Sequence, residues 1–236
     1  MLNGQRISII SGCRDRESFL LQSLPTWLAS PEIDEVVVVD WSSISPLEDA
    51  LKPYLHDTRL VIAVGSNQPR WHLTKCCNLG LLVSTGDLIL RLDSDVLLDR
   101  RFFADNPIEK GSFRGGYDLK ILPHPPGLWG VMFAFKEDIL RVNAYNERLV
   151  GYGWDDEDLF LRMATSGIDR GLIQYKHLKH LDHGPNLRLG TQSESLEVTN
   201  NRNQKLSLEF PWTSRDCRTK WELLRFGQIV RCAEVA

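Results

Sequence analysis

The chain has 236 residues, a length that suits one α/β domain or two smaller domains. Hydrophobic residues make up 42% of the chain and charged residues 25%, a balance that indicates a packed core and excludes general disorder. With 28 basic and 31 acidic residues the formal net charge is −3, which argues against a surface built to bind nucleic acid.

The cysteines and the hydropathy pattern bear on the cellular compartment. Five cysteines occur, an odd number with two of them adjacent, and they include no CxxC pair. We therefore expect neither a disulfide framework nor a zinc site of that type, and a reducing compartment. The N-terminal stretch lacks the apolar core of a secretion signal, and no window holds 18 uncharged apolar residues. We expect a cytoplasmic protein without a membrane span.

Short β-rich runs alternate with helix-like segments through the first half of the chain. We predict strands at residues 6–11, 35–40, 59–64 and 88–93, and helices at residues 17–28, 47–54 and 72–84. This alternation is typical of a doubly wound, mostly parallel sheet with flanking helices. Such sheets bind ligands at the carboxyl ends of their strands. Three of the predicted strands end in polar residues, at 11–14, 40–43 and 93–95.

The second half is less regular. We predict a strand at 130–135, a short helix at 136–142 and a helix at 155–163 that follows a Gly-Tyr-Gly-Trp turn. Residues 193–215 are polar and are expected to be irregular, and residues 221–232 are expected to form a last amphipathic helix.

An Asp-Ser-Asp triplet, Asp93 to Asp95, follows the fourth predicted strand. At a strand end, residues i and i+2 point to the same side, so the two carboxylates are expected to converge. A divalent cation such as Mg²⁺ or Mn²⁺ would make that arrangement favourable. The alternative is a surface turn that caps a helix, which is common for so short a motif.

Four consecutive acids, Asp155 to Asp158, follow the Gly-Tyr-Gly-Trp turn. Acids in the first turn of a helix interact favourably with its dipole, and this explains some of them. It does not explain the two glycines and two aromatic residues before them, which suggest a platform for a flat ring such as a sugar. A carboxylate beside such a platform can act as a general base for a hydroxyl.

Histidines and arginines complete the candidate residues. His177, His180 and His183 fall within seven residues, so a metal ligand among them is about as plausible as a structural role. Arg14, Arg16, Lys75 and Arg91 are expected near the ligand-binding edge of the sheet, where cations would suit a phosphate-bearing donor or merely face solvent.

Together these segments resemble the GT-A glycosyltransferases, in particular the inverting group of β-1,4-galactosyltransferases and chondroitin-polymerase-type enzymes. Residues 151–162 resemble the family's long G-[WY]-G-x-[ED]-D-x-D-x-x-x-R signature. Residues 90–95 resemble its D-x-D strand end, residues 38–43 the element that meets uracil and ribose, and residues 143–147 an N-G-Y-N-E segment with Ala144 in place of glycine.

The resemblance implies roles for individual residues. Asp156 matches the catalytic base, and Mn²⁺ or Mg²⁺ would be held by Asp95, His183 and Asp93, with His180 as the alternative histidine. The implied acceptor residues are Tyr152, Trp154 and Asp155. The implied donor residues are Arg14, Asp40, Arg91, Asp93, Ser94, Asp95 and Gly130, with Trp129 beside the donor sugar.

The resemblance also implies an activity and a domain plan. We expect a single-domain hexosyltransferase of polysaccharide biosynthesis that moves a sugar from a nucleotide-diphosphate donor, in particular a UDP-sugar, to a glycan hydroxyl with inversion. The GT-A domain would span 1–192, with a nucleotide half up to about residue 98, and 193–236 would be an extension that ends in a helix. Segments 111–116 and 184–201 are candidate lids. A retaining glycosyltransferase, a nucleotidyltransferase and a non-catalytic sugar-binding module remain alternatives.

Overall fold

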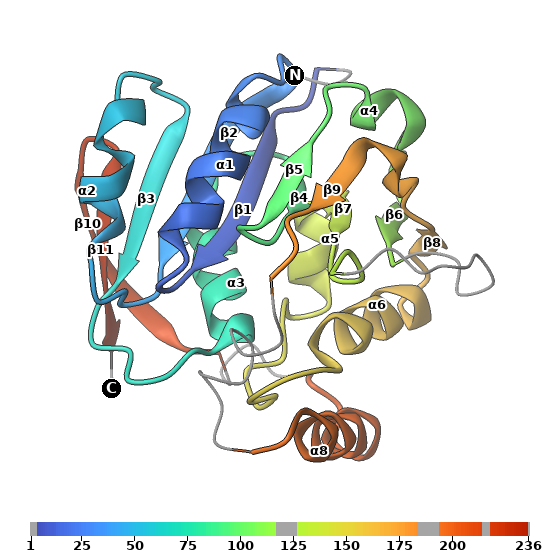
Figure 1. Cartoon of the computed structure of the whole chain (residues 1–236). Helices are drawn as coiled ribbons and strands as arrows, with labels where there is room; N and C mark the ends of the chain where they lie inside the picture. The colour runs from blue at the N-terminus through green and yellow to red at the C-terminus, as the bar shows by residue number, and fades with distance from the viewer. Residues whose placement is uncertain (1–3, 117–126, 184–193, 214–217, 236) are drawn as a thin grey trace.

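A large mixed sheet forms the centre of the protein (Figure 1). The computed structural model describes residues 4–116, 127–183, 194–213 and 218–235. Within these ranges nine strands form one sheet, in the order β10 (Lys220–Phe226), β11 (Ile229–Val235), β3 (Leu60–Gly65), β2 (Ile33–Asp40), β1 (Ile7–Cys13), β4 (Leu88–Arg91), β7 (Met132–Phe135), β6 (Ser112–Gly115) and β8 (Asp169–Gly171).

The expected mostly parallel α/β sheet is confirmed. Strands β11, β3, β2, β1 and β4 run parallel to one another, whereas β10 pairs antiparallel with β11, and β7 pairs antiparallel with β4 and β6. The run of valines in β2 shows why the first half folds this way. Val36 and Val38 pack into the core on one face of the sheet, and Val37 and Val39 pack into the core on the other. A continuous apolar strand is required where both faces are buried.

Helices cover both faces of the sheet. Helices α1 (Glu17–Leu28) and α2 (Leu47–Leu51) bury their apolar residues on one face, together with α4 (Phe102–Asp105). Helices α3 (Leu73–Val83), α5 (Lys136–Arg141) and α6 (Asp155–Thr165) bury theirs on the other face. Short 3-10 turns lie at Lys52–Tyr54 and Tyr175–His177. The crossovers bring the carboxyl ends of β1 and β4 to one edge of the sheet, as the sequence predicts.

The expectation for the C-terminal region is wrong in two respects. Residues Leu196–Glu209, expected to be irregular, form helix α8, and the Ser195 side chain caps it by accepting a hydrogen bond from the Val198 amide. The segment expected to be a last helix is instead a β-hairpin, with Gly227 at φ +60° in its two-residue turn. Strand β11 pairs with β3 and buries Val230 and Cys232 in the core. The division at residue 98 stays a prediction.

The predicted lids and a second, smaller sheet are the remaining points of comparison with the sequence. The prediction of a lid at residues 111–116 is wrong, because β6 lies inside the sheet between β7 and β8. Residues 184–193 of the second candidate lid lie outside the described residues. A separate two-stranded sheet pairs β5 (Val96–Leu98) with β9 (Leu178–His180), and the sequence showed no signal for it. In the described part of the chain, no helix combines the length and the apolar composition that crossing a membrane requires.

Candidate functional site

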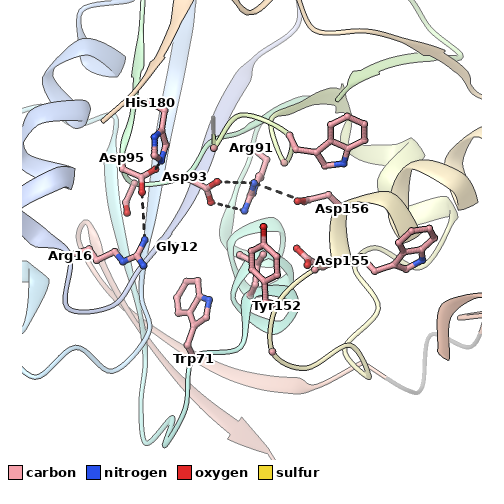
Figure 2. Close-up of a pocket in the computed structure, with 18 of the residues that line it drawn as sticks. Gly12, Arg16, Trp71, Arg91, Asp93, Asp95, Tyr152, Asp155, Asp156 and His180 are labelled. Carbon is pink, nitrogen blue, oxygen red and sulfur yellow. Dashed lines mark hydrogen bonds and ion pairs between the residues drawn. The ribbon is translucent and has the colours of Figure 1, made fainter. Parts of the chain in front are cut away.

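A pocket of about 530 Å³ opens at the carboxyl ends of β1 and β4, beside the start of α6 (Figure 2). Residues from both halves of the chain line it, including the triplet Asp93 to Asp95, the loop 151–154 and the acids Asp155 to Glu157. The sequence placed these acids at one edge of the sheet, and the structure brings them to one cavity.

One side of the pocket holds a cluster suited to a divalent metal. Ligand atoms of Asp95, His180 and His183 all lie within 4.8 Å of one another. The Nε2 atom of His183 lies 3.1 Å from Asp95 Oδ2, and that of His180 lies 3.6 Å from Asp95 Oδ1. The structure therefore brings both histidines to Asp95, where the sequence left the choice between them open.

The pairing of β5 with β9 creates this cluster. Val96 lies opposite His180 in the two-stranded sheet, and the Leu181 amide donates to the Asp95 carbonyl at 2.7 Å. The ring of Phe19 packs edge-on against His183, with centroids 5.6 Å apart. Residues more than 80 positions apart thus meet through backbone pairing, which no local pattern encodes.

The cluster fits a cation. Asp95 Oδ1 and His180 Nδ1 are buried and have no hydrogen-bond partner among the described residues. A buried polar atom without a partner is costly, and a divalent metal held by Asp95 and the Nε2 atoms that face it would satisfy the oxygen. Burial and the nearby Asp93 raise the pKa of Asp95, so its carboxylate gains from a positive charge beside it.

Asp93 does not join this cluster. Strand β4 ends at Arg91, so Asp93 to Asp95 follow the strand rather than lie in it, and the group of ligand atoms within 4.8 Å does not include Asp93. Asp93 instead accepts hydrogen bonds from the Arg91 guanidinium at 2.7 and 3.3 Å. Ser94 is buried between the two aspartates, and its carbonyl accepts a hydrogen bond from Ser23.

The acidic run at the start of α6 divides into structural and pocket-facing residues. Asp158 is buried and accepts hydrogen bonds from Asn146, Arg162 and Ser207. Glu157 pairs with Arg170 at 2.9 Å. Asp155 and Asp156 have no such ion-pair partner at hydrogen-bonding distance among the described residues, and both line the pocket.

Asp156 is the most perturbed acid at the pocket. The pKa of Asp156 is raised to about 8: burial raises it most, Arg91 lowers it, and the charges of Asp155, Asp93 and Glu157 raise it. Burial also raises the pKa of Asp155. A carboxyl group that titrates near neutral pH is suited to accept a proton from a substrate hydroxyl.

The loop before α6 has an unusual backbone that another helix supports. Gly151, Gly153 and Trp154 have φ values of +88°, +91° and +65°. Helix α8 packs against this loop: Thr199 hydrogen-bonds to both backbone groups of Tyr152. The loop presents Tyr152 to the pocket with 40% of its surface exposed, as expected of a residue that stacks on a sugar.

Of the two residues expected at the nucleoside, one lines the pocket. Arg14 is part of the lining and donates to the Gln68 carbonyl at 3.0 Å. Asp40 is not part of the described lining, and its two carboxylate oxygens accept hydrogen bonds from the Ser43 and Leu47 amides before α2. Trp71, which the sequence did not suggest, also lines the pocket.

Sequence reasoning gave no site role to several lining residues. They are Gly12, Trp71, Leu73, Gly127 and Asn200. A Cβ on Gly12 would lie 2.9 Å from the Trp71 ring, so the glycine at the end of β1 makes room for the aromatic side chain. The glycine at a strand end was the available signal for Gly12. Asn200 lay in the segment 184–201, which the sequence named as a candidate lid without singling out this residue.

Comparisons with known proteins agree with this geometry. The profile of a family described as the N-terminal domain of galactosyltransferase matches residues 123–184. The catalytic domain of Drosophila β1,4-galactosyltransferase 7 in complex with xylobiose has a TM-score of 0.66 at 14% identity, over 98% of this chain and 93% of that one. A mutant of that enzyme in complex with manganese, UDP-Gal and xylobiose has a TM-score of 0.65 at 14% identity, over the same shares.

A mannosyltransferase from Pyrobaculum calidifontis in complex with GDP-Man and Mn²⁺ has a TM-score of 0.57 at 17% identity, over 70% of this chain and 54% of that one. No curated protein sequence matches the chain. These similarities confirm the expected galactosyltransferase-like GT-A fold.

Proposed function

We propose that this chain, which has a galactosyltransferase-like GT-A fold, is a metal-dependent inverting glycosyltransferase. It transfers a sugar from a nucleotide-diphosphate donor, a UDP-sugar in the first instance, to a hydroxyl of a glycan acceptor. One observation carries the proposal: a single pocket has a metal-ligand cluster on one side and a buried carboxyl group with a pKa of about 8 on the other.

The donor side is built for a diphosphate. Asp95, His180 and His183 would hold Mn²⁺ or Mg²⁺, which supplies charge neutralisation for the departing diphosphate when it is bound. Arg16 lies 3.5 Å from Asp95 and extends the positive charge toward Arg14. Trp71 offers a flat face for the base of the nucleotide.

The acceptor side supplies the base. Asp156 accepts the proton of the acceptor hydroxyl while that oxygen attacks the anomeric carbon of the donor sugar. The bond from this carbon to the diphosphate breaks in the same displacement, and its electron pair leaves with the diphosphate, which inverts the configuration. Tyr152, Trp154 and Asp155 line the pocket beside Asp156 and would orient the acceptor ring and its hydroxyls.

The test measures UDP release when a panel of UDP-sugars is mixed with glycan acceptors in the presence of Mn²⁺. We expect release to require both metal and acceptor, and Asp156→Asn to lower kcat by about 100-fold or more. Asp138→Asn is the matched control, because Asp138 is a buried acid on α5 and is absent from the described lining of the pocket.

Folding of the variant can be checked by thermal unfolding. Because the pKa of Asp156 is raised in the native state, its ionisation costs stability as the pH rises from about 4 toward 8. Asp156→Asn is therefore expected to melt no lower than the native chain at pH 8. Normal transfer by a folded Asp156→Asn variant would contradict the base assignment.

Two outcomes would redirect the proposal. Retention of anomeric configuration in the product would indicate a retaining enzyme. Binding of nucleotide sugar and glycan without metal-dependent UDP release would indicate a sugar-binding module.

A further inference from the structure

Arg91 lies at the end of β4 and lines the pocket, although only 3% of its side chain is exposed. Its Nη2 atom lies 2.7 Å from Asp93 Oδ1, and its Nη1 atom lies 3.9 Å from Asp156 Oδ1 (Figure 2). A single buried guanidinium thus stands between a carboxylate beside the metal cluster and the carboxylate proposed as the base.

Gly130 packs closely against both Arg91 and Asp156. A Cβ at this position would lie 2.2 Å from Arg91 Nη1 and 2.5 Å from Asp156 Oδ2. Gly130 is not among the residues with positive φ, so its backbone conformation is open to other residues. The close approach of Arg91 and Asp156, rather than the backbone, is what requires glycine here.

Arg91 lowers the pKa of Asp156, whereas several other features of the site raise it. Asp155 and Glu157 on α6 and Asp93 in the turn after β4 carry like charges, and burial adds to their effect. Cys77 of α3 and Tyr145 also lie in the electrostatic surroundings of Asp156. Asp156 Oδ1 has no hydrogen-bond partner among the described residues, so the guanidinium is the cation that favours its ionised form.

We propose that Arg91 is a positioning residue that holds the base Asp156 in fixed relation to the donor side of the pocket by sharing its guanidinium with Asp93. The inference rests on the proposed function, because it presumes that Asp156 is the base. It also changes the role expected from the sequence: Arg91 lines the pocket, but its guanidinium hydrogen-bonds to Asp93, so we assign it to positioning rather than to direct binding of the donor phosphates.

Three variants separate charge from geometry. Arg91→Met removes the cation, whereas Arg91→Lys keeps a charge but loses the planar fork that reaches two carboxylates. Gly130→Ala keeps every charge and pushes Arg91 and Asp156 apart. We expect Arg91→Met to lower kcat by about 100-fold, with donor and acceptor KM values nearly unchanged, because a small misplacement of a reacting group has an effect of that size.

The midpoint of the kcat/KM pH profile is a second measurement, and it would stay unchanged if Arg91 had only a structural role. Asp156 must be ionised to accept a proton, and Arg91 favours that ionised form. Loss of the cation in Arg91→Met is therefore expected to move the midpoint of the kcat/KM profile to higher pH. Arg91→Lys should recover part of both kcat and the midpoint, and Gly130→Ala should show a smaller shift in the same direction.

Arg162→Met is the matched control. Arg162 forms a buried ion pair with Asp158 on the same helix as Asp156, at 2.5 Å, and does not line the pocket. This variant is expected to lower stability while leaving the pH midpoint in place.

The outcomes distinguish this inference from the proposed function. If Asp156→Asn is inactive but Arg91→Met and Gly130→Ala keep the native kcat and pH profile, the positioning role is wrong and the proposed function stands. A raised donor KM at unchanged kcat in Arg91→Met would make Arg91 a donor ligand and overturn the inference. If Arg91→Met does not fold, Arg91→Lys and Gly130→Ala carry the test.

Discussion

His180 and His183 differ from His177 in what their ring nitrogens face. His177 lies outside the pocket, with its Nε2 atom 2.5 Å from Asp105 Oδ2. His180 and His183 both point their Nε2 atoms at Asp95. Three histidines within seven residues therefore serve two purposes, and the spacing alone does not reveal which residue serves which.

These histidines provide a prediction for metal binding. His180→Ala and His183→Ala are each expected to weaken Mn²⁺ binding by at least about tenfold, because each removes one ligand of the cluster. His177→Ala should bind Mn²⁺ like the native chain and melt at a lower temperature. Isothermal titration of Mn²⁺ into the four proteins checks this, and equal losses in all three variants would contradict the assigned cluster.

At the scale of elements, helix α8 packs against the loop 151–154 and so shapes that side of the pocket. Asn203 donates to the Gly153 carbonyl at 2.9 Å, and a Cβ on Gly153 would lie 2.2 Å from the Asn200 side-chain oxygen. The loop 151–154 and α8 thus fit together closely at the point where the acceptor is proposed to bind. The geometry of the loop depends on a helix about 45 residues further along the chain.

Gly153→Ala tests this fit. Gly167→Ala is the matched control, because Gly167 has a similar φ of +86° with nothing within 4 Å of its added Cβ. Both variants are expected to lose about 1–2 kcal/mol from left-handed backbone strain. Only Gly153→Ala should raise the acceptor KM, by about tenfold, while the donor KM stays unchanged. Equal acceptor KM values in the two variants would show that α8 does not shape the site.

At the scale of the whole molecule, the C-terminal hairpin belongs to the main sheet. Strand β11 lies between β10 and β3, and Val230 is 1% exposed. The residues that follow α8 therefore complete the core on the side of the sheet where α3 packs. We expect the hairpin to unfold together with strands β3, β2 and β1.

Val230→Ala is expected to cost about 2 kcal/mol, because it opens a cavity in this core. The loss should appear as a lower urea midpoint of one transition, with an unchanged m-value, seen alike by tryptophan fluorescence and far-UV circular dichroism. Leu224→Ala, at a position that is 57% exposed on β10, should leave the midpoint nearly unchanged. A separate early transition in Val230→Ala would contradict a shared core.

The sequence predicted the first half of the fold well, because local patterns determine it. The valines of β2 alternate between two buried faces, and the apolar residues of α1 recur at helical spacing. The same reasoning failed for the hairpin. Residues 221–232 were expected to form an amphipathic helix, but Gly227 lies in a tight turn after β10, and β3 supplies a partner for β11. The pairing partner of a strand is not visible in its own sequence.

For the candidate site, the sequence by itself determined the kinds of chemical group and most of their positions: Asp95, Asp156, the histidines and the Gly-Tyr-Gly-Trp loop. Only the tertiary structure decided how they combine. It assigned Asp93 to Arg91 and Asp40 to a backbone turn, and it brought two histidines to Asp95. The reason is physical: charge, size and backbone preference belong to each residue, but burial and distance depend on strand pairings that join distant parts of the chain.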